Sequence, residues 1–453
     1  MRFLVLTGLS AGAVVLMIGG VLLLSAVRSP ASQESPTALV VSDTTPSATS
    51  TPDDATVSRS LDQLVDTATG RAVPLWSASE SGGSVHFSAD GRLLMYSKWF
   101  GDPAVARPVV DIIDLALDAP QPQSLTQGLG PQMSPDGRVV AFSTRSPDRV
   151  WVFDRTTSST RSLEPPGQLQ LWSPDSRWLT YWSPFAEPPE DRTLYLVDAR
   201  DWSVRTVGKA YLCQCDAPYG PFWSPDSRWF YYPYSSDRQP ALIDPASLAR
   251  TPVAGYPYWA PTGTRFITLD QQSMTLHSGP SDAGVPLVEG QRGVHRPLWS
   301  PDETMISYEG ANAGITALSL ATARPLWQAP GFSIGWSAGS EYFAAAEKGG
   351  RIEGSRLNIV RGADGGPMNS LENVLNPAWS PKEPVLALAR GYMSACNRPD
   401  NLMKLSLHLF DARTGEERLL LQGLESICRG SRPVIVWSPD GRYLALCSSC
   451  GGL

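Results

Sequence analysis

The segment with the clearest catalytic potential is 335–339 (GWSAG), which matches the G-x-S-x-G pattern of the nucleophile elbow in serine hydrolases. An elbow needs a strand before the serine, a helix after it, and acidic and histidine partners downstream. Residues 341–345 (EYFAA) have the pattern of a strand instead, and His408 is the only histidine that follows Ser337. We therefore interpret the segment as a turn and predict no catalytic residue in it.

The remaining acid–base and metal-binding side chains are dispersed. The four histidines are His86, His277, His295 and His408, and neither their spacing nor an H-E-x-x-H motif predicts a metal site. Several aspartates recur at one position of a repeated turn, where an aspartate bonds to its own backbone; they are Asp136, Asp175, Asp226, Asp302 and Asp440. No Asp-rich loop of the calcium-binding kind is present. We expect neither a metal nor a cofactor.

The six cysteines carry the other candidate chemistry. They are Cys213, Cys215, Cys396, Cys428, Cys447 and Cys450. An even number of cysteines in the loops of an exported domain favours disulfides. Cys396 with Cys428 would join neighbouring repeats, whereas Cys447 with Cys450, or Cys213 with Cys215, would close small rings. A C-x-x-C redox pair or a metal site is the alternative, although no redox-type helix follows Cys447.

The recurrent aspartates and the GWSAG segment belong to a repeated phrase. WSPDSRW begins at Trp172 and again at Trp223, and WSPDGRY begins at Trp437. Weaker copies begin at Phe87, Met133, Trp259, Trp299, Trp336 and Trp379. Successive copies, strong and weak together, start 36 to 58 residues apart. Proline presets the first corner of a tight turn, aspartate bonds back to the backbone, and glycine accepts the left-handed conformation. Because alternating apolar residues flank each turn, every copy predicts a β-hairpin.

A second strand pair follows the hairpins. Residues 193–198 (TLYLVD) and 203–207 (SVRTV) follow the hairpin at Trp172, and 405–411 and 417–421 follow the one at Trp379. Four strands repeated about every 40 to 50 residues are typical of a β-propeller blade. We predict an all-β fold, a single propeller of eight or nine four-stranded blades. The copies at Trp336 and Trp259 are the weakest.

The hairpin phrase and the strand pair resemble the TolB-like propellers, a WD40-like family whose blades carry a WSPDG-type hairpin. The resemblance extends from about residue 60 to the C-terminus and implies protein partners in the cell envelope. The small domain that precedes the propeller in that family has no counterpart here, so the resemblance does not imply the Tol-system role. The hydrolase domain that follows a similar propeller in prolyl-oligopeptidase-type enzymes has no counterpart either.

The two ends of the repeat region complement each other. Residues 61–75 (LDQLVDTATGRAVPL) have the pattern of a blade's second strand pair without a preceding hairpin, and the hairpin at Trp437 has no strand pair after it. We therefore expect the two ends to pair within one blade, which removes free sheet edges.

The N-terminal part differs in composition. Phe3 to Val27 is an uncharged run of 25 residues, long enough to cross a bilayer. Residues 29–60 are rich in Ser, Thr and Pro and predict a disordered linker. We expect residues 1–28 to be a transmembrane signal anchor, and residues 61–453 to be a propeller tethered to the cell membrane and lying outside the cytoplasm. Cleavage after Ala31, which would release it, is the alternative.

The composition limits the classes of partner. The net charge is −7, with 37 basic and 44 acidic residues and no basic cluster, so we expect no nucleic-acid binding. Aromatic residues gather in loops at the rim opposite the SPDG turns, and the same rim carries the cysteines. This candidate binding rim consists of Trp182, Phe185, Tyr211, Tyr219, Phe222, Tyr256 and Tyr258. Such side chains could bind a protein or a glycan, or could pack between blades.

The sequence therefore favours a non-catalytic binding or scaffold protein that engages a protein or glycan through this rim. The alternative is an extracytoplasmic hydrolase or lyase that acts on glycans or peptides in the central channel. Two carboxylates within about 5 to 10 Å of each other in the channel would favour that alternative.

Overall fold

The computed structural model describes residues 59–447, apart from 61, 76–79, 101–107, 118–119, 145–147, 185–191, 211–222, 234–239, 271–272, 292, 311–313, 348–354, 393–401 and 428–433. These residues belong to one compact unit, Ser42–Leu453. Within them no helix is long and apolar enough to span a bilayer. The apolar run Phe3 to Val27 and nearly all of the predicted linker lie outside the described residues.

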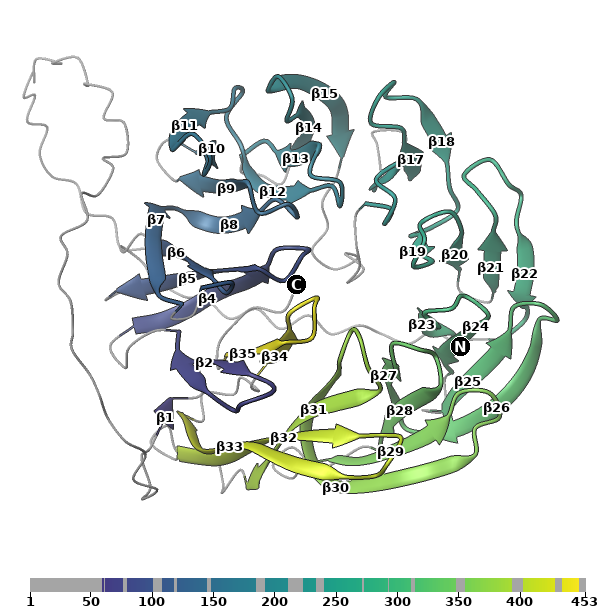
Figure 1. Cartoon of the computed structure of the whole chain (residues 1–453). Helices are drawn as coiled ribbons and strands as arrows, with labels where there is room; N and C mark the ends of the chain where they lie inside the picture. Colours follow the sequence, from purple (N-terminus) through teal and green to yellow (C-terminus); the bar gives the residue numbers. More distant parts are fainter. Residues whose placement is uncertain are drawn as a thin grey trace, which may run out of the picture. The chain divides into compact units, whose positions relative to one another are not determined.

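The described fold is all-β, as predicted (Figure 1). Its sheets are antiparallel meanders in which consecutive strands pair, apart from the parallel strand β1 and the pair of β2 with β35. The first three four-stranded sheets are β4 (Glu80–Phe87), β5 (Leu93–Phe100), β6 (Val109–Asp114) and β7 (Pro122–Gln127); β8 (Leu129–Met133), β9 (Val139–Thr144), β10 (Arg149–Asp154) and β11 (Ser159–Ser162); and β12 (Gln168–Trp172), β13 (Trp178–Trp182), β14 (Arg192–Asp198) and β15 (Ser203–Ala210).

Three further sheets continue this order. They are β16 (Phe230–Tyr232), β17 (Ala241–Ile243) and β18 (Arg250–Pro252); β19 (Tyr258–Trp259), β20 (Phe266–Leu269), β21 (Met274–His277) and β22 (Val285–Val288); and β23 (His295–Trp299), β24 (Met305–Glu309), β25 (Gly314–Ser319) and β26 (Arg324–Pro330). An isolated bridge between Trp223 and Phe230 stands where the first strand of the three-stranded sheet is expected.

One sheet contains eight strands because two meanders share a long strand. It comprises β27 (Phe332–Trp336), β28 (Tyr342–Ala346), β29 (Ser355–Arg361), β30 (Pro367–Trp379), β31 (Val385–Tyr392), β32 (Leu402–Asp411), β33 (Glu417–Ile427) and β1 (Arg59–Ser60). The first part of β30, from Pro367 to Val374, pairs with β29, and its second part, from Val374 to Trp379, pairs with β31. The short strand β1 runs parallel to the edge strand β33.

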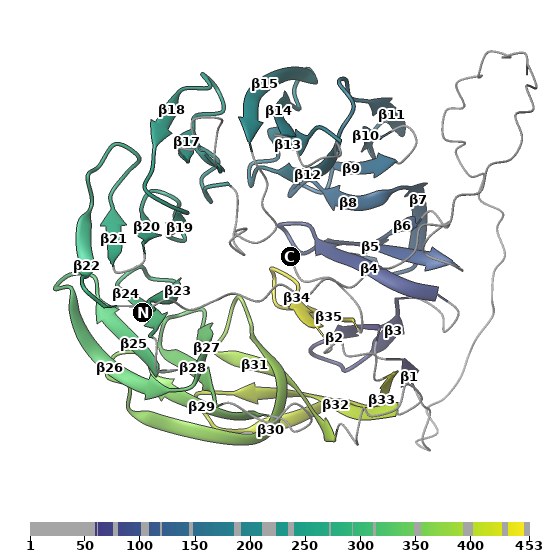
Figure 2. The same ribbon diagram turned by 180° about the vertical axis from the view of Figure 1, so that it is seen from behind.

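The predicted pairing of the two ends is present in the last sheet. It consists of β34 (Val434–Trp437), β35 (Tyr443–Cys447), β2 (Gln63–Asp66) and β3 (Ala72–Pro74). β2 pairs with β35 in the register Leu64 to Ala445, although the two strands lie at opposite ends of the described chain. Figure 2 shows this sheet, purple and yellow, between neighbours from both ends of the chain.

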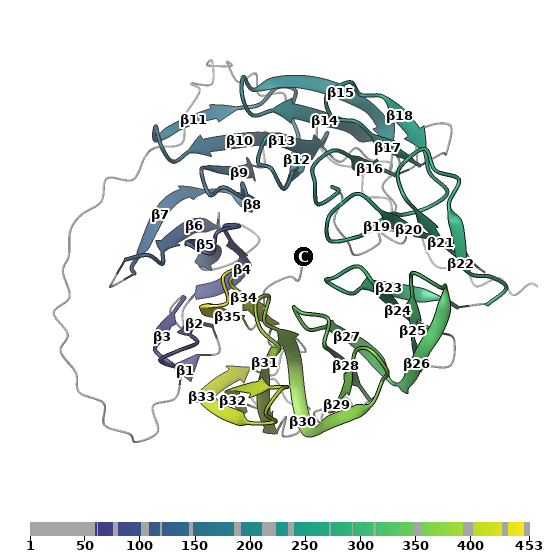
Figure 3. The ribbon, with the colours of Figure 1, turned by 45° about the vertical axis from the view of Figure 1, so that its right-hand side comes forward.

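The core lies between the sheets. In the described part of the chain, nine clusters of buried apolar side chains each join two consecutive four-strand units, counting the two halves of the eight-stranded sheet separately. One cluster joins Leu64 and Tyr443 of the last sheet to Leu94 and Tyr96 of the first, which completes a ring. Figure 3 shows the sheets side by side around a common centre, which is the arrangement of a β-propeller.

Candidate functional site

In the copies of the WSPDG-type phrase that contain a serine, its hydroxyl organises the turn. At Trp172 the Ser173 hydroxyl donates to the Asp175 carboxylate at 2.5 Å and accepts the Trp178 N–H at 2.9 Å, while the Arg177 N–H donates to Asp175 at 3.1 Å. Serine-to-aspartate bonds of 2.5–2.6 Å recur in five other copies, namely Ser88–Asp90, Ser134–Asp136, Ser224–Asp226, Ser300–Asp302 and Ser438–Asp440. These aspartates therefore build turns, as the sequence predicted.

Neighbouring turns are also bonded to each other. The Ser176 hydroxyl accepts the Asp136 N–H of the preceding turn at 2.9 Å, and Ser227 accepts the Asp175 N–H at 2.9 Å. Ser340 accepts the Asp302 N–H in the same way at 3.0 Å. The three serines have φ of 63°, 61° and 65°, at the position where glycine is expected. The side-chain bond thus stabilises a residue type that rarely adopts this conformation.

The G-x-S-x-G segment is one of these turns. Ser337 is fully buried, and its hydroxyl accepts the Tyr342 N–H at 3.1 Å. The Ser340 N–H donates to the Ser337 carbonyl at 2.9 Å and closes the turn, and the chain continues as strand β28. The predicted turn is confirmed, since an elbow would lead into a helix.

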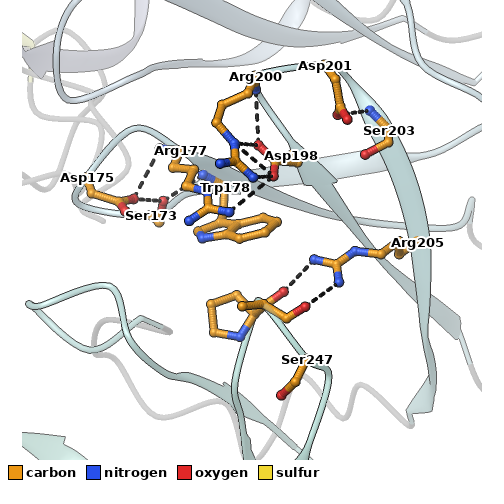
Figure 4. Close-up of polar contacts among 12 residues, drawn as sticks. Ser173, Asp175, Arg177, Trp178, Asp198, Arg200, Asp201, Ser203, Arg205 and Ser247 are labelled. Atoms are coloured by element: carbon orange, nitrogen blue, oxygen red, sulfur yellow. Dashed lines mark hydrogen bonds and ion pairs between the residues drawn. The ribbon is translucent and has the colours of Figure 1, made fainter.

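Charged groups near the turn at Trp172 are paired with one another (Figure 4). Asp198 binds Arg200 at 2.6 Å and Arg177 at 3.4 Å, and the hydrogen bond from Arg200 lowers the pKa of Asp198 to about 2. Arg205 reaches the next sheet, where it donates to the Ala246 carbonyl at 2.8 Å. The guanidinium groups of Arg177 and Arg205 flank the Trp178 ring at 4.3 and 5.1 Å. Cation–π contacts and ion pairs therefore fix these side chains within the third sheet, and the Arg205 hydrogen bond links this sheet to the next one.

Indole groups link successive sheets deeper in the ring. Each donor is the tryptophan of a hairpin, and each acceptor is the carbonyl just before the corresponding residue of the preceding hairpin. The described bonds, at 2.9–3.2 Å, run from Trp172 to Gln132, Trp299 to Tyr258, Trp336 to Leu298, Trp379 to Gly335 and Trp437 to Ala378. The indole nitrogens of Trp223 and Trp259 are buried without a hydrogen-bond partner. The repeated tryptophan thus has a structural role.

Three residues of the candidate binding rim are described. Trp182 is buried, with 7% of its surface exposed, in the cluster between the third and fourth sheets. Tyr256 and Tyr258 are half-buried, and the Tyr256 ring contacts those of Tyr231 and Tyr258 edge-on at 5.1 and 5.2 Å. Phe185, Tyr211, Tyr219 and Phe222 lie outside the described residues, so the structure does not bring the predicted rim together as a whole.

Most predicted disulfide residues also lie outside the described part, namely Cys213, Cys215, Cys396, Cys428 and Cys450. Cys447 ends β35, is fully buried and is disulfide-bonded. The pairing pattern stays a prediction, because every potential partner is outside the described residues. No group of three or more His, Cys, Asp and Glu side chains suited to a metal occurs among the residues that the structure describes.

Two histidines lie away from any candidate site, one of them packed within a sheet and the other buried. The His277 ring stacks on Phe266 at 4.7 Å and hydrogen-bonds to the Thr268 hydroxyl at 2.9 Å. Burial lowers the pKa of His86 to about 4, so its ring is neutral near neutral pH.

A third histidine, His295, is more than half exposed and lies 3.4 Å from the Glu309 carboxylate. Glu309 is buried, accepts the Ser333 N–H at 2.8 Å and pairs with Arg296 at 3.2 Å. A buried carboxylate is tolerated here because it has both a hydrogen-bond donor and a cation.

The fourth histidine belongs to a cluster that the sequence analysis missed. The His408 Nε2 lies 2.8 Å from the Ser406 hydroxyl, and its Nδ1 lies 2.8 Å from Glu417 Oε1. Arg390 holds the same carboxylate through two N–H groups at 2.5 Å. Ser406 and His408 share one face of β32, Glu417 begins β33, and Arg390 lies on β31. The available signal was the alternation in 405–410 (LSLHLF), which places the serine and the histidine on the same side of a strand.

Comparisons with known proteins give distant similarities. No family model matches the chain. An uncharacterised protein of Agrobacterium fabrum, Atu1656, is 23% identical over 284 residues, which are 55% of this chain and 92% of that protein. Among solved structures, a eukaryotic initiation factor matches 80% of this chain and 96% of its own at 13% identity and a TM-score of 0.49.

Two other solved structures are similar at the same level. Dipeptidyl peptidase 4 of Porphyromonas gingivalis matches 72% of this chain and 61% of its own at 13% identity and a TM-score of 0.48. The C-terminal WD40 domain of Sif2 matches 74% and 95% at 10% identity and a TM-score of 0.42. The β-propeller architecture follows from the sheets and their shared clusters, and none of these similarities bears on function.

Proposed function

We propose that this chain is a binding or scaffold protein, with no catalytic role for its binding rim, built on a nine-bladed β-propeller. The count of nine treats the eight-stranded sheet as two blades, which is supported by the division of β30 between two partner strands and by the separate cluster between the two halves. Each blade then packs one face of its sheet against the preceding blade and the other face against the following blade.

We place the binding surface on the aromatic rim rather than on the turn rim. In the described turns, serine hydroxyls, aspartate carboxylates and backbone N–H groups largely satisfy one another within and between blades. We assign Tyr256 and Tyr258, a half-buried tyrosine pair that keeps aromatic surface partly exposed at the start of β19, to the opposite rim. This partly exposed pair is the observation that carries the proposal, since amphipathic aromatic side chains are the usual anchors of protein and glycan contacts.

Both phenols are neutral at physiological pH. Burial raises the pKa of Tyr256 and that of Tyr258 above their ordinary value. The pair would therefore contribute apolar area and neutral hydrogen bonds to a partner, and no charge.

We further propose that residues 1–28 anchor the protein in the cytoplasmic membrane and that residues 29–58 form a tether that displays the propeller outside the cytoplasm. The predicted linker of residues 29–60 is wrong at its end, because Arg59–Ser60 form strand β1 and pair with β33. The uncharged run Phe3 to Val27 and the TolB-like hairpin phrase support this location. The partner is then a protein or glycan of the cell envelope.

The proposal is tested by capture from cell envelopes with the full chain extracted from membranes. We expect Tyr258→Ala to weaken capture of the partner at least tenfold, as loss of an interface anchor does. Tyr195→Ala, which removes another half-buried tyrosine whose ring contacts that of Tyr181 at 5.0 Å within the third blade, is the matched control and should capture normally. Equal capture by both variants would show that the rim tyrosines serve packing and not binding. Recovery of the full chain in the soluble fraction would contradict the membrane anchor.

A further inference from the structure

The cluster of Ser406, His408 and Glu417 has the connectivity of a nucleophile, a base and a carboxylate. Because Glu417 Oε1 accepts from the His408 Nδ1, the neutral imidazole carries its proton there and leaves Nε2 as an acceptor. The Ser406 O–H then donates to Nε2 over 2.8 Å, in preference to the Arg390 carbonyl, which is farther away at 3.5 Å. This is the tautomer and the order of contacts that activate a serine in acyl-transfer enzymes.

The charge state of the cluster suits proton transfer. The hydrogen bonds from Arg390 lower the pKa of Glu417, which keeps this carboxylate ionised at neutral pH. Burial lowers the pKa of His408, although Glu417 opposes the shift, so the imidazole is neutral at neutral pH and can accept a proton there.

The sheet is irregular at this position. The pairing of β32 with β33 changes register between Leu405 and Leu407, which flank Ser406, and again between Leu407 and His408. β-Bulges re-aim side chains and are over-represented next to active sites. Here the two shifts place Ser406 outside the regular ladder, which begins at His408.

The cluster is accessible to a small molecule. The side chains of His408 and Glu417 are 17% and 22% exposed, and Ser406 is partly exposed. The turn serines differ from Ser406 in exposure and in hydrogen bonding. Ser173 and Ser337 are fully buried, and their hydroxyls accept backbone N–H groups of the turn. Ser406 is thus distinguished from these turn serines by its contact with an imidazole.

We propose that Ser406 is a nucleophile that accepts the acyl group of a small activated ester, a reaction separate from the binding function proposed above. The Ser406 Oγ forms a bond to the acyl carbon as its proton passes to His408 Nε2. The bond to the alcohol or phenol leaving group breaks, and that group takes the proton from His408. Water then attacks the acyl-serine by the same route and releases the acid. Glu417 is the positioning residue that fixes the tautomer of His408.

The test uses the purified full chain with p-nitrophenyl acetate and a fluorophosphonate probe. We expect release of p-nitrophenolate and a probe adduct on the peptide that contains Ser406. Ser406→Ala should abolish the adduct and reduce the rate at least 100-fold, and His408→Gln should reduce both similarly. Ser370→Ala is the matched control, because Ser370 lies on the same sheet in a polar contact with Arg356 at 2.8 Å without a histidine partner; it should keep the full rate.

The pH profile separates a chemical role from a structural one. The rate should rise with pH as His408 loses its proton, with a midpoint below the ordinary histidine value of 6.5. Glu417→Gln should lower the rate and move this midpoint, whereas a merely structural cluster would leave any background hydrolysis unchanged. Absence of the adduct in the wild-type chain, or equal labelling and equal rates in Ser406→Ala and wild type, would overturn the proposal.

Discussion

At the residue scale, the serine of the repeated phrase does more than its position in a turn motif suggests. Ser173 both donates to Asp175 and accepts the Trp178 N–H, so one hydroxyl fixes the turn and the start of the next strand. The role of the aspartate was predictable from turn chemistry. The role of the serine was not, because the motif alone does not specify which backbone group the hydroxyl meets.

The tryptophan of the phrase provides a residue-scale prediction. Trp336 donates its indole N–H to the Leu298 carbonyl at 3.2 Å, whereas the indole nitrogen of Trp259 has no partner, and both side chains are 7% exposed. Trp336→Phe should therefore lower the free energy of unfolding by about 1 kcal/mol more than Trp259→Phe, the value of one hydrogen bond. Urea unfolding of the two variants measures the difference, and equal losses would show that the indole bond contributes nothing.

At the element scale, the hairpins and strand pairs were largely predictable, since their period-2 alternation and turn residues are local signals. The fusion of two blades through β30 was not, because the shared strand joins what the pattern treats as separate segments. The cluster at Ser406 was missed for a related reason. Glu417 meets His408 diagonally across the β32–β33 ladder, in which His408 is the partner of Leu419 and Glu417 is the partner of Phe410. Alternation within one strand does not reveal the register between two strands.

The bond between turns gives an element-scale prediction. Ser340 has φ of 65° and accepts the Asp302 N–H of the preceding turn. Ser340→Ala should cost about 1 kcal/mol of unfolding free energy, because the bond is lost and the unfavourable conformation remains. Ser340→Gly should lie within about 0.5 kcal/mol of wild type, since glycine relieves the strain that offsets the lost bond. Thermal unfolding compares the two, and equal destabilisation would mean that strain at this position is negligible.

At the scale of the whole molecule, the sequence indicated both the repeat and the pairing of its ends, because residues 61–75 and the last hairpin are complementary halves of one pattern. The candidate rim was less predictable. Loops and sheet interfaces contain the same types of aromatic residue. Trp182 is buried between sheets, whereas Tyr256 and Tyr258 stay partly exposed. Composition alone does not separate packing from recognition.

The most direct test of the closed ring is a pair of cysteines across the strands from the two ends of the described chain. Leu64 and Ala445 are direct partners in the β2–β35 ladder, and Ala445 is also the partner of Val436 on β34. Partners on adjacent strands lie about 4.5–5.5 Å apart, within disulfide range, whereas Leu64 and Val436 are separated by two strand spacings, roughly 9–10 Å.

The measurement is mass spectrometry of peptides from the oxidised full chain. In the double variant Leu64→Cys with Ala445→Cys, the closed ring predicts a disulfide that links the peptides containing positions 64 and 445. The control, Leu64→Cys with Val436→Cys, should give no link between positions 64 and 436. Absence of the first link, or equal linking in both variants, would contradict a ring closed by strands from its two ends.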